Sequence, residues 1–331
     1  MINLGVIGTN WITRVFINAA LATGEYELTA VYSRKLETAQ KFVEDFSDVE
    51  IATDLKTFFE LEHLDTVYIA SPNSLHFEQA RAAILAGKNV IVEKPAFSTP
   101  DEMAEIIQLA NQKRVFFFEA ARNIHEAGFK KIVDYLCDKQ VIGASFTYMK
   151  YSSRYDAVLD GEEPNIFSPH FSGGAIMDLG VYLVYAALGW FGMPRSQYYF
   201  AQKISTGVDG LGLGVLRYED FDVALQTGKI GDSFLPSEIY FEDGTLILSG
   251  VSAFEKAEFY HRTTKKTTVL FDQGEKLPMF DQATDFAKVI QNPSDPDLGE
   301  AYQEWVELAR NVNEVIYALR KQANITFDAD K

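Results

Sequence analysis

The sequence contains a single cysteine, Cys137, among its 331 residues. One cysteine cannot form an internal disulfide, so the sequence fits a reducing compartment and we expect a cytoplasmic protein. We expect Cys137 itself to serve as a small buried hydrophobic residue. The chain begins Met-Ile-Asn-Leu-Gly-Val, with no basic residues ahead of an apolar stretch. This start predicts a strand and argues against a secretory leader.

Basic residues are also scarce, since 30 Lys and Arg stand against 47 Asp and Glu, for a net charge of -17. Nucleic acids and anionic membranes attract basic patches, so we expect neither as a partner. The five histidines lack metal-ligand spacing with carboxylates or with the cysteine, and we predict no metal site. The longest apolar run, 175–191, contains Asp178 and falls short of the roughly 20 residues that cross a bilayer, which favours a buried helix.

The chain is too long for one ordinary hydrophobic core and suits two domains. Through residues 1–120, short apolar runs typical of strands alternate with helical stretches. This alternation predicts right-handed βαβ units and the parallel sheet of a Rossmann domain. Beyond residue 120, consecutive strand-like runs predict a large, mainly antiparallel sheet with closing helices. We therefore expect an α/β domain over 1–120 and an α+β domain over 121–331.

The glycine-rich segment Gly5-Val6-Ile7-Gly8-Thr9-Asn10-Trp11-Ile12-Thr13 lies where the first predicted strand passes into a helix. Where a strand passes into a helix, such a turn lets the backbone approach a pyrophosphate at the helix N-terminus. Gly8 fills the first position of the usual G-x-G-x-x-G/A pattern, while Asn10 and Thr13 replace the other two glycines. We expect Asn10 to preserve the turn because asparagine tolerates positive φ. The residues predicted to bind the dinucleotide here are Gly8, Thr9, Asn10, Trp11 and Ile12.

The second predicted strand ends in Val31-Tyr32-Ser33-Arg34. NAD-specific sites usually carry an acidic residue here, which accepts a hydrogen bond from the ribose 2′-hydroxyl, whereas an arginine suits a 2′-phosphate. Ser33 supplies a hydroxyl and Arg34 a planar cation that can also stack on adenine. We therefore predict NADP in preference to NAD, with a solvated loop arginine as the alternative.

Further motifs follow later strands. They are Ser71-Pro72-Asn73-Ser74-Leu75-His76, then Glu93-Lys94-Pro95, and then Gly173-Gly174-Ala175-Ile176-Met177-Asp178-Leu179-Gly180-Val181-Tyr182. Together with the glycine turn, they resemble the Gfo/Idh/MocA family of glucose-fructose oxidoreductase and inositol dehydrogenase relatives, over essentially the whole chain. The version with tyrosine at 182 is similar to the branch that contains dimeric dihydrodiol dehydrogenase and xylose dehydrogenase.

The resemblance implies a nicotinamide-dependent oxidoreductase that forms a homodimer through its large sheet. It implies a C-terminal domain like that of glyceraldehyde-3-phosphate dehydrogenase. The residues that it assigns to the cofactor, besides the glycine turn, are Ser71, Pro72, Asn73, His76, Glu93 and Lys94.

Asp178 and Tyr182 are four residues apart on one predicted helix and therefore share a face. A carboxylate in so apolar a helix needs a cationic or donating partner, for which Lys94 is the natural candidate. A tyrosine beside an ammonium has a lowered pKa and can exchange protons near neutral pH. We predict that Tyr182 exchanges the proton. Lys94 lowers the pKa of this tyrosine and holds the substrate oxygen, and Asp178 orients the site. A core aromatic and a helix-to-loop tether are the alternative roles, and whether Lys94 or Tyr182 is the main proton donor stays open.

The substrate pocket is predicted to involve Arg122, His125, Phe167, His170 and Tyr182. The first two stand where relatives commonly carry bulkier aromatic residues or methionine. We expect a dehydrogenase or reductase that acts on a CH–OH group of a sugar, a polyol or a related compound. Two alternatives are a non-catalytic dinucleotide-binding regulatory protein and a hydrolase or lyase that uses tightly held NAD transiently.

Overall fold

The computed structural model describes residues 1–274 and 277–331, and its contacts divide the chain into two units. Unit one comprises Met1–Ala120 and Leu277–Glu307, and unit two comprises Ala121–Lys276 and Leu308–Lys331. The first boundary coincides with the expected one after residue 120, but residues 277–307 belong with unit one rather than with the second domain. Aromatic packing explains this difference, because Phe286 stacks on Phe118 of unit one with 4.5 Å between ring centroids.

Unit one contains a six-stranded parallel sheet with the strand order β3-β2-β1-β4-β5-β6. Its strands are β1 (Ile2–Ile7), β2 (Tyr26–Tyr32), β3 (Glu50–Ala52), β4 (Thr66–Ile69), β5 (Asn89–Glu93) and β6 (Phe117–Ala120). The order reverses between β1 and β4, which makes their carboxyl ends the edge where doubly wound sheets bind ligands. The predicted Rossmann domain is confirmed.

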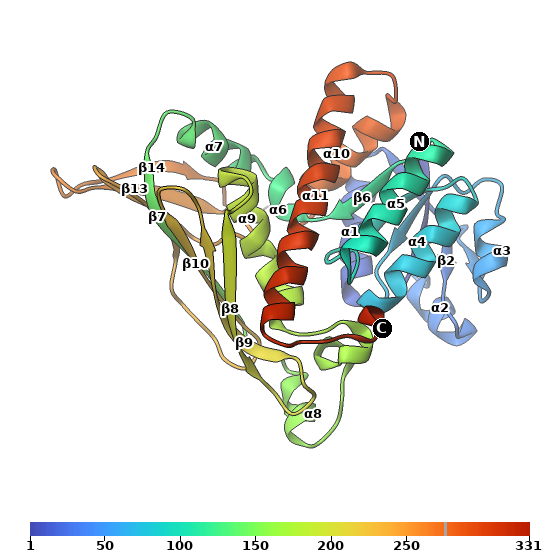
Figure 1. The fold of residues 1–331 in the computed structure, drawn as a ribbon. Coiled ribbons are helices and arrows are strands. Elements are labelled where there is room, and N and C mark those ends of the chain that lie inside the picture. The colour runs from blue at the N-terminus through green and yellow to red at the C-terminus, as the bar shows by residue number, and fades with distance from the viewer. Residues whose placement is uncertain (275–276) are drawn as a thin grey trace. The chain divides into compact units, whose positions relative to one another are not determined.

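Helices flank this sheet, because each right-handed crossover returns the chain over one of its faces. They are α1 (Trp11–Ala22), α2 (Leu36–Phe42), α3 (Leu55–Phe59), the short η1 (Asn73–Leu75), α4 (His76–Leu85), α5 (Pro100–Lys113) and α10 (Phe280–Gln291). Helices α4 and α5 pack side by side (Figure 1), whereas α1 packs against α10. Helix α11 (Pro296–Gln322) starts in unit one and ends in unit two.

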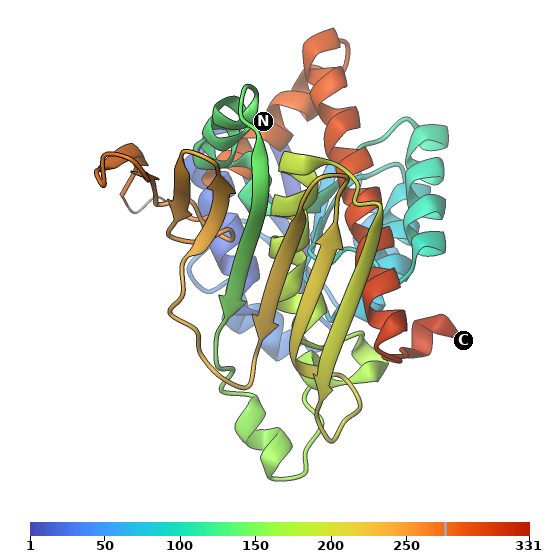
Figure 2. The same ribbon diagram turned by 60° about the vertical axis from the view of Figure 1, so that its left-hand side comes forward.

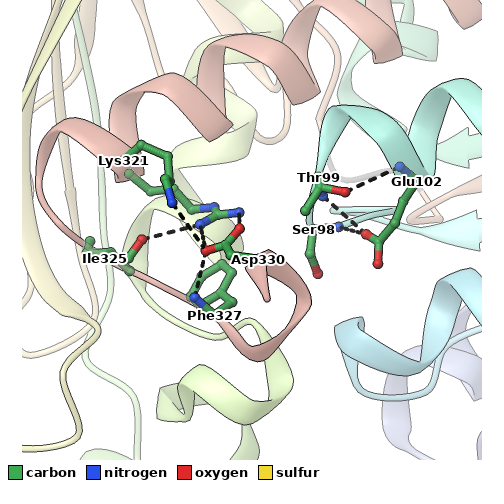
Figure 3. A network of polar contacts seen from close by, with 8 residues as sticks. Ser98, Thr99, Glu102, Lys321, Ile325, Phe327 and Asp330 are labelled. Carbon is green, nitrogen blue, oxygen red and sulfur yellow. Dashed lines mark hydrogen bonds and ion pairs between the residues drawn. The ribbon is translucent and has the colours of Figure 1, made fainter.

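Helix α5 shows how the local sequence fixes a helix start. The Thr99 hydroxyl accepts a hydrogen bond from the Glu102 amide at 3.3 Å, and the Glu102 carboxylate accepts one from the Thr99 amide at 3.1 Å (Figure 3). Pro100 occupies the first helical position, where a backbone donor is not needed. This capping box starts α5 directly after the loop that follows β5.

Unit two contains an eight-stranded sheet in the order β14-β13-β12-β11-β7-β10-β9-β8. Its strands are β7 (Val141–Met149), β8 (Ser196–Lys203), β9 (Asp209–Arg217), β10 (Asp222–Gly228), β11 (Ser237–Phe241), β12 (Gly244–Leu248), β13 (Lys256–His261) and β14 (Thr267–Asp272). Strands β7 and β10 run parallel, and the remaining pairs are antiparallel. The expected large, mainly antiparallel sheet is confirmed.

A π-helical turn (Ile176–Gly180, η4) passes directly into α9 (Val181–Phe191) and packs on one face of this sheet. The segment Pro169–Phe191 is long and apolar enough to cross a membrane, but 83% of its apolar window is buried inside the protein, as in a core helix. In Figure 2 the opposite face of the sheet carries none of the described helices of unit two. The other helices of this unit are α6 (Arg122–His125), α7 (Ala127–Leu136), α8 (Tyr155–Leu159), η2 (Asn165–Phe167), η3 (Pro169–Phe171) and η5 (Asp328–Asp330).

Cys137 follows the last turn of α7 and is exposed, so the expectation of a buried cysteine is wrong. The buried face of α7 is formed by Phe129 and Ile132. Cys137 lies instead on the side of Val133, one turn before it, whose carbonyl oxygen accepts from its thiol at 3.5 Å. The helical period therefore turns the cysteine away from the core.

Candidate active site

Gly8 is the residue of the glycine turn whose conformation demands glycine. Its φ is +109°, and a Cβ at this position would lie 2.7 Å from the carbonyl oxygen of Ala70, at the end of β4. The turn therefore passes close to the neighbouring strand and leads into the 12-residue helix α1. This close approach, followed directly by the N-terminus of α1, fits a bound pyrophosphate. Of the residues predicted to bind it, Asn10 and Trp11 are exposed, Trp11 at 74%.

Asn10 keeps the turn in a way that the sequence did not predict. Its φ of -94° and ψ of 179° are extended, so the expectation of a positive φ is wrong. Its side chain caps α1 by accepting from the Thr13 amide at 3.1 Å, and its Nδ2 donates to the Ala70 carbonyl at 2.8 Å. Asn10 thus ties the helix start to the end of β4, and this bond takes up the side-chain amide.

His76 connects the two loops that follow β4 and β5. It is buried, with Nε2 2.8 Å from the Ser71 carbonyl and Nδ1 3.3 Å and 3.2 Å from the carbonyls of Pro95 and Ala96. Burial lowers the pKa of His76, and the positive charge of Lys94 acts in the same direction, although the three carbonyls oppose it. The structure places this predicted cofactor residue inside unit one, where it holds both loops.

The loop that carries Lys94 has two further supports. The Tyr68 hydroxyl donates to the Glu93 carboxylate at 2.5 Å, and the Ala96 amide donates to the Glu119 carboxylate at 3.0 Å. Both carboxylates are buried, whereas Lys94 is half-buried at the end of β5. Because both buried carboxylates accept hydrogen bonds, they fix the end of β5 and the loop after it, and with them the position of Lys94.

Ser33 and Arg34 directly follow β2, as predicted. The Ser33 amide donates to the carbonyl of Ala52 on β3 at 3.2 Å, and its hydroxyl accepts from the Lys35 amide at 3.4 Å. Ser33 is half-buried, and the two cations after it are exposed. The sheet edge therefore presents one hydroxyl and two cationic side chains beside each other. Ser71, Pro72 and Asn73 lie at the end of β4, where the Ser71 hydroxyl donates to Gln79 at 2.7 Å.

In unit two, a buried carboxylate holds the start of the π-helical turn that follows the glycine pair. Asp209 accepts from the Ile176 amide at 2.7 Å and from the Tyr199 hydroxyl at 2.5 Å. Gly174 has a φ of +122°, and a Cβ there would lie 2.2 Å from the Asp209 carboxylate. Burial raises the pKa of Asp209, although the bonds from Tyr199 and Ile176 oppose this effect. The carboxylate thus fixes the start of the helix that bears Asp178.

Asp178 lies in the π-helical turn and forms an ion pair with Lys229, the residue directly after β10. The Lys229 ammonium lies 5.9 Å from the ring centroid of Phe167, a predicted pocket residue that is fully buried. Tyr182 follows one turn after Asp178 and contacts Tyr148 of β7 edge to face, with 5.9 Å between ring centroids. Unit two therefore brings Asp178, Lys229 and Phe167 together, while Tyr182 extends from the next turn of the helix.

The other predicted pocket residues have separate surroundings. Arg122 donates from Nε to the Ser252 carbonyl at 3.1 Å, and His125 is buried in the same short helix α6. His170 is exposed, and its Nδ1 lies 2.5 Å from the carboxylate of Asp328 near the C-terminus, which raises the pKa of His170. The structure thus ties His170 to the C-terminal residues.

Lys229 and Asp209 were not predicted from the sequence. Asp178 and Lys229 are 51 residues apart, and Ile176 and Asp209 are 33 apart, so no local spacing announces either contact. The signal that was present is a charged residue at one end of each of two strand-like segments, Asp209 at the start of β9 and Lys229 directly after β10. Within residues 1–274 and 277–331, no group of three or more His, Cys, Asp or Glu residues could hold a metal ion.

Comparison with known proteins identifies the family of the chain. Residues 2–120 match the oxidoreductase family with an NAD-binding Rossmann fold. The chain is 39% identical to an uncharacterized oxidoreductase of Escherichia coli, YgjR, over 100% of this chain and 99% of that protein. The chain belongs to the Gfo/Idh/MocA oxidoreductase family. This family member is also 34% identical to scyllo-inositol 2-dehydrogenase (NADP(+)) IolU of Bacillus subtilis, with both chains covered completely.

The fold of this Gfo/Idh/MocA member also matches solved structures. A 3-ketoreductase from Actinomadura kijaniata, in complex with NADP and TDP-benzene, superposes with a TM-score of 0.83 over 97% of each chain. The identity is 22%, so this likeness supports the fold alone. With the family assignment, the protein is an NAD(P)-dependent oxidoreductase whose dinucleotide domain is unit one.

Proposed function

We propose that the protein is an NADP-dependent dehydrogenase that interconverts a hydroxyl and a carbonyl group on a polyol or sugar, with a cyclic polyol as the first candidate. The observation that carries this proposal is the placement of Asp178 and Tyr182 one turn apart on an otherwise apolar helix. The substrate class rests on the full-length similarity to the scyllo-inositol 2-dehydrogenase (NADP(+)) of Bacillus subtilis. Ser33 and the cations after it favour NADP.

The bound nicotinamide supplies or accepts the hydride. The residues of the chain must then accept or donate one proton, because oxidation of the alcohol releases the hydroxyl proton and reduction of the ketone requires one. We assign this exchange to the hydroxyl of Tyr182, and to the Lys94 ammonium the donation of a hydrogen bond to the substrate oxygen. Asp178 orients the helix face from which Tyr182 extends. Gly8, Thr9, Asn10, Trp11 and Ile12 hold the pyrophosphate.

The test is NADP-linked oxidation of scyllo-inositol, and reduction of the matching ketone, by the wild type, Tyr182→Phe and Lys94→Met. We expect turnover to fall about 10²–10⁴-fold in each variant, the range for loss of a proton-transferring group. Tyr240→Phe is the control, because the hydroxyl of this tyrosine donates to Glu238 on its own strand, β11. Near-normal turnover in both variants would contradict the assigned roles.

The same assay separates the two alternative functions. A regulatory protein would bind NADPH without turning over any polyol or sugar. A hydrolase or lyase would retain its cofactor through purification and convert substrate without net change in the cofactor's redox state. Retention of Lys94, Asp178 and Tyr182 favours the dehydrogenase over both.

We propose further that the protein forms a homodimer through the uncovered face of the sheet in unit two. This face includes Phe200 of β8 and Leu213 of β9, which are directly paired and are 71% and 51% exposed. Tyr198, also on β8, is 46% exposed on the same face. Apolar side chains gathered on one side of a sheet favour a partner that removes them from water.

A further inference from the structure

Lys229 is a buried cation in unit two. Only 6% of its surface is exposed, and its ammonium forms an ion pair with the Asp178 carboxylate. The ring of Phe167 lies beside this ion pair, with its centroid 5.9 Å from the ammonium. A lysine this far from water is costly unless an anion accompanies it, so the pair acts as one unit.

The backbone around Lys229 is held on both sides. Its amide donates to the Gly210 carbonyl of β9 at 2.7 Å, and its carbonyl accepts from the Ser152 amide, beyond β7, at 2.9 Å. Asp209, next to Gly210, holds the Ile176 amide. The β9–β10 pair therefore grips the π-helical turn at two points, once at its first amide and once at the Asp178 side chain.

We propose that Lys229 is a positioning residue of the reaction, which keeps Asp178 ionised and in one orientation and thereby fixes the helix face that bears Tyr182. This inference rests on the proposed function, because it assigns Lys229 a role through Asp178. Lys229 supplies the charge from a rigid strand end, so that the carboxylate is ordered before the substrate arrives. Preorganised charges of this kind contribute to catalysis because they need no rearrangement during the reaction.

The kinetic test compares Lys229→Met, Lys229→Arg and Lys256→Met with the wild type. We expect Lys229→Met to lose about 10²-fold in kcat, the cost of a misplaced reacting group, with an unchanged Kd for NADPH. Lys229→Arg restores most of the loss because it returns the charge. Lys256→Met is the control, since it removes a lysine that pairs with Glu258 on β13, where both side chains are only half-buried. Wild-type kcat in a folded Lys229→Met protein would overturn the proposal.

A second measurement does not require activity. In protein labelled with ¹³C at the aspartate carboxyl carbons, the Asp178 signal is assigned by its loss in Asp178→Asn and followed against pH. We expect its titration midpoint to move to higher pH in Lys229→Met and to stay near that of the wild type in Lys229→Arg. Tyr148 and Asp209, which also pack around this helix, are retained in both variants.

The two measurements distinguish the possible failures. If the wild type turns over no polyol or sugar, the proposed function fails, and the carboxyl titration alone judges whether Lys229 controls Asp178. If the Asp178 signal titrates identically with and without Lys229, the positioning role is overturned whatever the enzyme's activity.

Discussion

Arg34 follows β2 at the point where a dinucleotide-binding sheet contacts the adenosine ribose. It is exposed, and its neighbours are the half-buried Ser33 and the exposed Lys35. An exposed guanidinium contributes little to the stability of the fold, but it can bind a phosphate through two parallel hydrogen bonds. At this residue, the expected effect of a substitution is therefore on cofactor choice and not on folding.

We predict that Arg34→Ala weakens NADPH binding about tenfold or more, which corresponds to about 1.4 kcal/mol, and leaves NADH binding nearly unchanged. Parallel calorimetric titrations of both cofactors measure the difference. Arg81→Ala serves as the control because Arg81 pairs with Glu105 on helices of the same unit. Equal weakening of NADPH and NADH, or tighter binding of NADH by the wild type, would reject the NADP assignment.

Gly174 is a residue at which both the backbone and the space demand glycine. Its φ is positive, and a Cβ would meet the buried carboxylate of Asp209. We predict that Gly174→Ala lowers the free energy of unfolding by more than the roughly 1–3 kcal/mol of a strained backbone conformation alone, because Asp209 must also move. Thermal unfolding measures this loss. Gly207→Ala is the matched control, since Gly207 also has a positive φ, of +95°, but has open space around it. Equal losses in both variants would contradict the prediction, because they would mean that the Asp209 side chain moves aside without a free-energy cost.

At the scale of elements, the C-terminal residues are held to α11 by a buried ion pair. Arg320 donates to both carboxylate oxygens of Asp330, at 2.7 Å and 2.6 Å, and to the Ile325 carbonyl at 3.2 Å. The Phe327 amide donates to the same carboxylate at 2.8 Å, as Figure 3 shows. Because Asp328 in this segment also holds His170, the short helix η5 ties the end of the chain to the loop before the glycine pair.

We predict that Arg320→Met destabilises the protein by about 3–5 kcal/mol, the cost of leaving one partner of a buried ion pair without the other. Urea denaturation measures the loss. Arg217→Met provides the control, because Arg217 also binds an aspartate, Asp222, through two hydrogen bonds but is exposed. We expect a much smaller effect there, since solvent screens exposed pairs. Similar losses in both variants would contradict the importance of burial.

At the scale of the whole molecule, an antiparallel sheet can leave a polar face in water, but the uncovered face of the large sheet in unit two carries apolar side chains. The η4–α9 segment packs on one face, and the opposite face exposes Tyr198, Phe200 and Leu213. An edge strand such as β8 with exposed apolar side chains invites association unless a specific partner covers it. A second copy of the chain would cover this face symmetrically.

We predict that the protein sediments as a dimer at micromolar concentration and that Phe200→Glu converts it to a monomer, because a charge buried in an apolar interface is strongly unfavourable. Analytical ultracentrifugation distinguishes the two states. Leu85→Glu is the control, since Leu85 is an exposed leucine on α4 of unit one. A wild-type monomer, or a Phe200→Glu dimer as stable as the wild type, would reject this interface.

The sequence by itself determined most of the architecture. Strand and helix periods along residues 1–120 predicted the parallel sheet, and consecutive strand-like runs predicted the mainly antiparallel one. Both signals are local, because they depend on which side chains alternate or repeat along one segment. Short elements such as β3, α3 and α8 were missed because three to five residues are too few to display a period.

The tertiary structure decided what local patterns cannot encode. It joined residues 277–307 to unit one through Phe286 and Phe118, and it paired Asp178 with Lys229 from a strand end 51 residues away. It also gave Asn10 an extended conformation that reaches Ala70, and it enclosed His76 between two loops. Each of these contacts depends on strand register and on the path of distant loops. The sequence therefore names the chemical groups, whereas folding decides which of them meet.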